Sequence, residues 1–183
     1  MWSNYDQSRV KLLKLVDVSN LNDLINPAHL GRCFSSLLGL SIRSIFDATT
    51  LLTVFAQFKP TPCLVLGQGV SVDADLDPKI VSRAINSMVN VSVIGDAFTG
   101  EHIHAIFKDI LKKSSLKLLC LRNPRNTIKL DNIDIKLLIN VASSLEEFSI
   151  QMSMLNKEQQ DALLQLQNTT NVNVCDIQYP VSS

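Results

Sequence analysis

Three aspartates at alternate positions have the clearest potential for metal chemistry in this chain. Asp73, Asp75 and Asp77 have the spacing with which an EF-hand calcium loop begins. Such a loop also requires glycine at its sixth position and glutamate at its twelfth, where this chain has Pro78 and Ala84. We therefore interpret the aspartates as part of a solvated loop that leads into a helix, and we expect no calcium site.

Two histidines and a pair of glycines are further candidates for metal or nucleotide binding. His102 and His104 are two residues apart, so on a helix their side chains point about 200° away from each other and cannot share one ion without a further element. The Gly-Gln-Gly turn at 67–69 is similar to the start of a dinucleotide-binding turn, but the third glycine would fall at Val72. The sequence also contains no G-x-S-x-G, G-x-x-x-x-G-K or H-E-x-x-H pattern. We expect no cofactor, no metal and no catalytic centre.

Charge balance and hydropathy limit the classes of partner. The 183 residues include 17 basic and 17 acidic side chains, without a basic cluster, whereas a nucleic-acid partner needs a clustered excess of Lys and Arg. No window approaches about 18 consecutive apolar residues, so we expect no membrane span. The first residues lack the apolar stretch of a secretory signal, and the four cysteines lie far apart. We therefore expect a cytoplasmic or nuclear protein with reduced thiols.

A three-residue pattern, in which the first and third residues are apolar and the middle residue varies, recurs along the chain. An anchor residue precedes each triplet by three positions, and the intervals between anchors are 24, 24, 27, 28, 29 and 24 residues. A period of this length is typical of repeat architectures. The triplets occupy 16–18, 40–42, 64–66, 91–93, 119–121, 148–150 and 172–174.

Helical patterns separate the triplets. Asp77 before Pro78, Thr99 and the pair Asn156 and Gln159 are typical of helix starts. The chain is therefore predicted to alternate strand and helix about seven times, in one domain with an N-terminal cap over 1–12, repeats over 13–177 and a tail over 178–183. Helices are expected at 26–38, 50–58, 78–88, 99–111, 131–142 and 156–166.

The central residues of the triplets distinguish between two α/β architectures. A doubly wound sheet has helices on both faces, so its strands are apolar throughout, whereas a repeat horseshoe has helices on one face only. Five of the seven central residues are polar, and burying each without a partner would cost about 1–3 kcal/mol. We therefore expect one face of the sheet to be hydrated. The central residues are Asp17, Ser41, Val65, Ser92, Cys120, Ser149 and Asn173.

The spacing resembles that of leucine-rich repeats, in particular the ribonuclease-inhibitor-like subclass found in NLR-type sensors, F-box receptors and tropomodulin-like proteins. The resemblance implies an α/β solenoid with a parallel sheet on the concave face and helices on the convex face. The chain departs from the family at the Asn/Cys position of the repeat, where it has residues such as Ile45 and Pro124, although Asn123 lies one place earlier. The pattern L-x-x-L-x-L is carried by Leu116, Leu119 and Leu121, by Leu145, Phe148 and Ile150, and by Met88, Val91 and Val93.

The resemblance and the lack of catalytic motifs together predict a non-catalytic scaffold that binds a protein partner through the concave face and adjacent loops, as an adaptor or as the terminal repeats of a larger sensor or ligase subunit. The alternatives are a small doubly wound enzyme or nucleotide-binding domain, and a tropomodulin-like cytoskeletal capping module. Arg43 and Arg122 are the expected anchors, because arginine is enriched among residues that dominate binding energy. The full set of expected contact residues is Arg43, Ser92, Lys117, Arg122, Arg125, Glu147 and Gln151.

Overall fold

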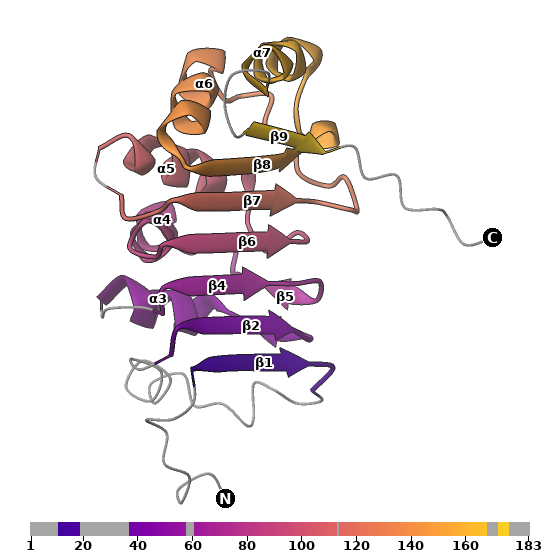
Figure 1. The fold of residues 1–183 in the computed structure, drawn as a ribbon. Coiled ribbons are helices and arrows are strands. Elements are labelled where there is room, and N and C mark those ends of the chain that lie inside the picture. Colours follow the sequence, from indigo (N-terminus) through magenta and orange to yellow (C-terminus); the bar gives the residue numbers. More distant parts are fainter. Residues whose placement is uncertain (1–10, 19–36, 58–60, 113, 168–171, 176–183) are drawn as a thin grey trace, which may run out of the picture.

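Seven parallel strands form the main sheet of the protein. The computed structural model describes residues 11–18, 37–57, 61–112, 114–167 and 172–175. The strands of this sheet lie side by side in the order in which they occur along the chain (Figure 1). The predicted α/β class with a parallel sheet is confirmed. The strands are β1 (Leu12–Val16), β2 (Gly39–Arg43), β4 (Cys63–Leu66), β6 (Asn90–Ile94), β7 (Leu118–Arg122), β8 (Glu147–Gln151) and β9 (Val172–Cys175).

The described helices lie together on one side of this sheet, behind the strands in Figure 1. Consecutive helices pack against each other. Among the described residues, no helix has the length and apolar character needed to cross a membrane. A small second sheet pairs β3 (Phe46–Asp47) with β5 (Val70–Ser71). The helices are α3 (Thr49–Gln57), α4 (Pro78–Asn86), α5 (Gly100–Ile110), α6 (Ile135–Ser144) and α7 (Lys157–Gln167), with a short 3-10 turn η2 (Met152–Met154).

Side chains at the helix starts determine where the helices begin. Asp77 accepts a hydrogen bond from the Lys79 amide, and Thr99 and His102 form a reciprocal capping box at α5, as the sequence predicts. Helix α6 begins at Ile135 rather than near 131, because the carboxylate of Asp134 accepts from the Leu137 amide and caps the helix there. Most of the helix expected over 26–38 lies outside the described residues.

The hydrophobic core fills the space between the sheet and the helices. Strands β6 and β7 alternate half-buried and buried side chains, with Val93 and Leu121 among those facing the helices. Phe148 from β8 meets Phe107 from α5 edge to face, with ring centroids 6.0 Å apart. Both rings are fully buried, so this pair joins the sheet to the helical layer.

The strand pairing matches the predicted register in the last six triplets and differs in the first. Leu40 pairs with Leu64, and the matching position continues along the sheet to Val172. In β1, however, Leu13 rather than Val16 pairs with Leu40. Asp17 therefore lies in the turn after the strand, with φ 50°, and Lys14 takes the central position. The predicted cap over 1–12 overlaps the strand at Leu12; residues 1–10 and the tail over 178–183 lie outside the described part.

Candidate functional site

The candidate site is the face of the main sheet opposite the helices, called the open face below. No described helix lies in front of the strands on this side (Figure 1). Because side chains alternate along each strand and the strands are in register, the open face consists of three rows. The amino-end row is Leu12, Gly39, Cys63, Asn90, Leu118 and Glu147, the central row is Lys14, Ser41, Val65, Ser92, Cys120 and Ser149, and the carboxyl-end row is Val16, Arg43, Gly67, Ile94, Arg122 and Gln151.

Solvent exposure varies along the central row. Ser92 is half-buried, whereas Ser41 and Ser149 are only 8% and 4% exposed. Since no described helix lies over β2 or β8 on this side, we attribute the burial of these short side chains to their larger neighbours in the sheet. The central row is therefore mostly covered at these serines, whereas longer side chains of the two outer rows, such as Arg43 and Glu147, are exposed to solvent.

Five of the seven expected contact residues lie in the rows of the open face, and the buried one, Gln151, is described below. Arg43 and Glu147 are exposed, and Ser92 and Arg122 are half-buried. All four belong to the three rows defined above, on strands β2, β6, β7 and β8. The structure thus brings together on one surface residues that are up to 104 positions apart in the sequence.

Two other expected residues lie at the borders of the sheet. Lys117 precedes β7 and forms an ion pair with Glu146, with 2.7 Å between Nζ and Oε1. Arg125 lies beyond the other end of β7 and approaches Asp96 at 3.6 Å. Both pairs are largely exposed, so each contributes little to stability. Lys117 and Arg125 therefore frame the open face at opposite strand ends.

Gln151 differs from its expected exposed position, because it is only 4% exposed and its amide is fully used. Its Oε1 accepts from the backbone amide of Asn123 at 2.8 Å. Its Nε2 donates to Asn126 at 3.1 Å and to Ser153 at 2.8 Å. Gln151 therefore connects the turn after β7 to the turn after β8 and has a structural role.

A second link between turns involves a residue that the sequence reasoning missed. The buried hydroxyl of Ser44, which follows β2, accepts from the Val18 amide after β1 at 2.9 Å. Asn123, which lies one place before the Asn/Cys position, uses its side-chain amide within its own turn, donating to Thr127 at 3.1 Å. Ser44 precedes Ile45 by one place, as Asn123 precedes Pro124, and this shared offset is the signal that could have identified it.

The aspartates that suggested a calcium loop are used to order the backbone. Asp73 accepts from the Asp75 amide at 3.0 Å, and Asp77 caps α4. Among the residues that the structure describes, no three His, Cys, Asp or Glu side chains are arranged to hold a metal ion. The glycine turn at 67–69 leads into the short strand β5 rather than into a helix, and Gly69 adopts φ 87°, which favours glycine.

The two histidines of α5 have different environments. His102 is fully buried. Its Nδ1 accepts from the Thr99 amide at 3.3 Å, and its Nε2 lies 2.9 Å from the carbonyl oxygen of Leu76. Because a carbonyl only accepts, these contacts fix the tautomer that carries its proton on Nε2. His102 is therefore a structural residue, whereas His104 is partly exposed.

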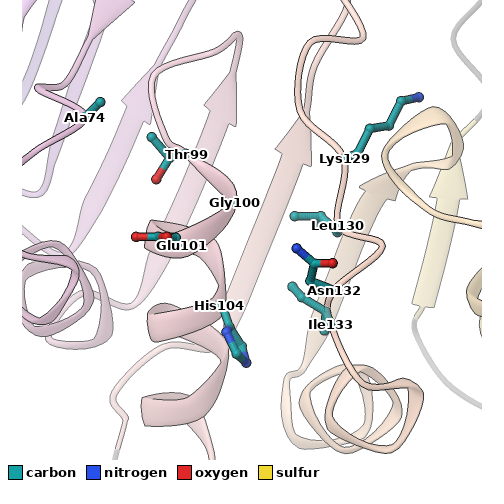
Figure 2. A pocket seen from close by; sticks show the side chains of 9 residues that line it. All are labelled: Ala74, Thr99, Gly100, Glu101, His104, Lys129, Leu130, Asn132 and Ile133. Carbon is teal, nitrogen blue, oxygen red and sulfur yellow. The ribbon is translucent and has the colours of Figure 1, made fainter.

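His104 borders a hollow on the helical side of the molecule, between α5 and the segment that leads to α6 (Figure 2). The hollow has a volume of about 560 Å³ and is lined by residues that include His104, Leu130 and Asn132. Figure 2 shows Glu101 pointing away from the 129–133 segment, and Lys129 donates to the Ser153 carbonyl at 2.6 Å instead of reaching into the hollow. Few polar groups therefore converge in it, and the open face is the stronger candidate.

We expect His104 to make stability depend on pH. Burial, and then the positive charge of Lys108, lower the pKa of His104 below its ordinary value. The unfolded chain then binds more protons than the folded one between the two pKa values, so the contribution of His104 is complete above about pH 6.5 and is lost as the pH falls. His104→Gln should flatten the pH dependence of the free energy of unfolding between about pH 7.5 and 5, as measured by urea titration.

Asp109 provides a matched control for this prediction. A hydrogen bond from Ser82, and then one from Lys112, lower the pKa of this carboxyl group. Its stabilising contribution is present above the unfolded pKa, near about 4, and is lost only below it. Asp109→Asn should therefore leave the slope between about pH 7.5 and 5 unchanged. An unaltered slope in His104→Gln would contradict the assignment to His104.

No protein family, curated protein or solved structure matches the chain. The function is therefore inferred from the geometry of the open face.

Proposed function

We propose that the chain is a non-catalytic protein-interaction scaffold with the architecture of a leucine-rich-repeat solenoid, and that it binds a protein partner through the open face, which would be the concave side. The single observation that carries this proposal is the parallel sheet in chain order, with described helices on one side only. In solenoids each repeat packs against its neighbours alone and leaves an extended surface for partners. A cytoplasmic location is part of the same proposal.

The strand order weighs against a nucleotide-binding domain. In doubly wound sheets the ligand binds where the strand order reverses, at the carboxyl ends of the strands. The order β1-β2-β4-β6-β7-β8-β9 contains no reversal. The described helices also cover one face, whereas that architecture needs two covered faces.

The composition of the open face suits a protein partner. Charged Arg43 and Glu147 lie on the same surface as half-buried apolar residues such as Val65 and Ile94. Protein interfaces combine apolar patches with polar rims and are enriched in arginine. The ion pairs at Lys117 and Arg125 provide such a rim at both ends of the strands.

A bulky side chain in the middle of the open face should block the partner. We expect Ser92→Trp to remove most of the proteins that the wild-type chain captures from cell extract, because an indole would project from the central row. Ser143→Trp is the matched control, since Ser143 is exposed on α6, on the helical side. Capture would be quantified by mass spectrometry, after circular dichroism has shown that both variants are folded.

Equal capture by the wild type and by Ser92→Trp would contradict binding through the open face. Loss of capture in Ser143→Trp alone would place the partner on the helices. A thermal shift of several degrees with a nucleotide would instead favour the nucleotide-binding alternative, because a ligand stabilises the folded state that binds it.

A further inference from the structure

We propose that the partner docks on the open face through an acidic extended segment, whose carboxylates bind Arg43 and Arg122. This inference rests on the proposed function and specifies the chemistry of the partner. It is carried by the charge of the face, by the environments of the two arginines and by the distance between their strands.

The open face carries an excess of positive charge in a chain that has none overall. Acids and bases balance at 17 each in the whole sequence. On the three described rows of the open face, Lys14, Arg43 and Arg122 are basic and Glu147 is acidic. Glu147 belongs to the amino-end row, whereas both arginines belong to the carboxyl-end row, so the carboxyl-end half of the face is positive.

Arg43 extends over Gly67, the residue that directly follows the neighbouring strand β4. A Cβ atom added to Gly67 would lie 3.2 Å from Cβ of Arg43, which is tight, and 2.5 Å from its Cγ, which is closer than real contacts allow. The glycine therefore provides the space that the stem of Arg43 occupies. Because β4, which Gly67 directly follows, lies between β2 and β6, the stem is directed across the sheet toward the side on which Arg122 lies.

Arg122 contains a buried donor without an acceptor. Its Nε is buried and has no hydrogen-bond partner, the single such side-chain atom among the described residues. A buried donor is costly to leave unpaired. A carboxylate of a partner can bind the terminal N–H groups of this guanidinium, and it would reach the covered Nε–H only after the side chain has moved.

Neither arginine has an ion pair with a residue that the structure describes. Asp96, in the turn after β6, approaches Arg125 instead, at 3.6 Å. Arg43 and Arg122 thus differ from the basic residues at the borders of the sheet. A partner can therefore neutralise both arginines without breaking an ion pair of the described residues.

The distance between the two strands suits an extended peptide. Strands β2 and β7 are separated by β4 and β6, so their main chains lie about 14 Å apart. Side chains on one side of an extended segment recur about every 7 Å. Carboxylates two to four residues apart in such a segment can therefore reach both guanidinium groups.

A polyanion such as a nucleic acid fits the same surface less well. Apolar Ile94 lies beside Arg122 in the carboxyl-end row, and Glu147 lies on the same face. A phosphate backbone needs a continuous track of basic residues, whereas an acidic protein segment can pair a few carboxylates and place apolar side chains between them. We therefore commit to a protein segment.

The test uses a fluorescent extended peptide of about twelve residues with Glu and Ser at alternate positions. Its controls are the same peptide with Gln for Glu, and a short single-stranded thymidine oligonucleotide. We expect fluorescence anisotropy to show binding of the Glu peptide that weakens with salt, and no comparable binding of the controls. Arg43→Gln/Arg122→Gln should weaken binding about tenfold or more. Lys79→Gln/Lys108→Gln, which removes the same charge from the exposed helical side, should change it less than about twofold.

Gly67→Ala tests the placement of Arg43 without changing any charge. The added methyl group must displace the Arg43 stem, so we expect the affinity for the Glu peptide to fall about threefold or more. Circular dichroism and thermal unfolding would show that the variant is folded. An unchanged affinity in the folded variant would overturn the role assigned to the position of Arg43.

Several outcomes would overturn the acidic partner. The first three are no binding of the Glu peptide, equal binding of the Gln peptide, and tighter binding of the oligonucleotide. The fourth is self-association that Arg43→Gln/Arg122→Gln abolishes, which would make a second copy of the chain the occupant. Failure of this inference is separable from failure of the proposed function. A cellular partner lost by Ser92→Trp but retained by Arg43→Gln/Arg122→Gln would overturn the acidic segment alone, whereas a partner retained by both variants would overturn binding through the open face.

Discussion

Phe148→Ala is expected to lower the free energy of unfolding by about 4 kcal/mol, the largest effect that we predict for a single substitution. Phe148 is fully buried and contacts Phe107 at 6.0 Å between ring centroids. Truncation would remove the apolar ring, its edge-to-face contact and the packing of β8 on α5, and would leave a cavity that a rigid layer fills only in part. Urea denaturation followed by circular dichroism would measure the loss.

Phe148→Leu is the control for this substitution, because leucine keeps most of the buried volume. We expect it to cost about 1.5 kcal/mol or less. A loss in Phe148→Ala as small as that in Phe148→Leu would mean that the ring does not join the sheet to the helices. The slope of unfolding free energy against urea should stay the same in both variants, since the surface exposed on unfolding is unchanged.

His102→Ala is expected to cost about 3 kcal/mol, through lost packing and two unpaired backbone groups. The ring is fully buried and lies edge-on to Phe98, with centroids 6.2 Å apart. Without the ring, the carbonyl of Leu76, in the loop before α4, loses its hydrogen-bond donor. The amide of Thr99, in the capping box of α5, loses its acceptor. Thermal and urea unfolding would both report the change.

His104→Ala provides the matched comparison on the same helix. His104 is partly exposed, so we expect its loss to cost less than about 1 kcal/mol near neutral pH. Equal effects of the two substitutions would contradict the structural role of His102. A folded His102→Ala variant that loses partner capture while His104→Ala retains it would instead indicate that His102 acts in binding.

Most of the strand register could be predicted because burial of apolar pairs repeats in phase along the sheet. The first repeat could not, because its sequence Leu-Leu-Lys-Leu-Val-Asp-Val contains two apolar triplets, at 13–15 and 16–18. Both have the same pattern, and spacing alone favoured the second. In the structure Leu13 pairs with Leu40, so the triplet at 13–15 is the one aligned with the other strands. This pairing depends on contacts with another strand.

The positions of α6 and Gln151 also depended on contacts between distant segments. Asp131 and Asp134 are both plausible helix caps in sequence, and only the hydrogen bond from the Leu137 amide distinguishes Asp134. For Gln151, strand alternation predicts an outward side chain. The long turn after β7 comes close enough for Asn123 and Asn126 to form hydrogen bonds with the side-chain amide of Gln151. The length of the turn in the sequence does not predict that it packs against Gln151.

The sequence predicted which residues share the open face, but it did not predict the contacts of their side chains. Alternation along the strands was sufficient to place Arg43, Ser92, Arg122 and Glu147 on one surface. The environment of each side chain was not, because the space above Gly67 and the unpaired Nε of Arg122 arise only when neighbouring strands are side by side. These two features describe the surroundings of Arg43 and Arg122, the two residues proposed above to bind carboxylates.

The turns after the strands absorb differences in the sequence spacing between neighbouring strands. Leu40 and Leu64 are 24 residues apart and Leu119 and Phe148 are 29 apart, yet both pairs stay aligned. A shift of one residue inside a strand would turn every side chain to the opposite face, whereas extra residues in a turn leave the hydrogen-bonded lattice intact. Insertions and deletions that arise during evolution should therefore collect in these turns, where they diversify the outline around the open face while its frame is inherited unchanged.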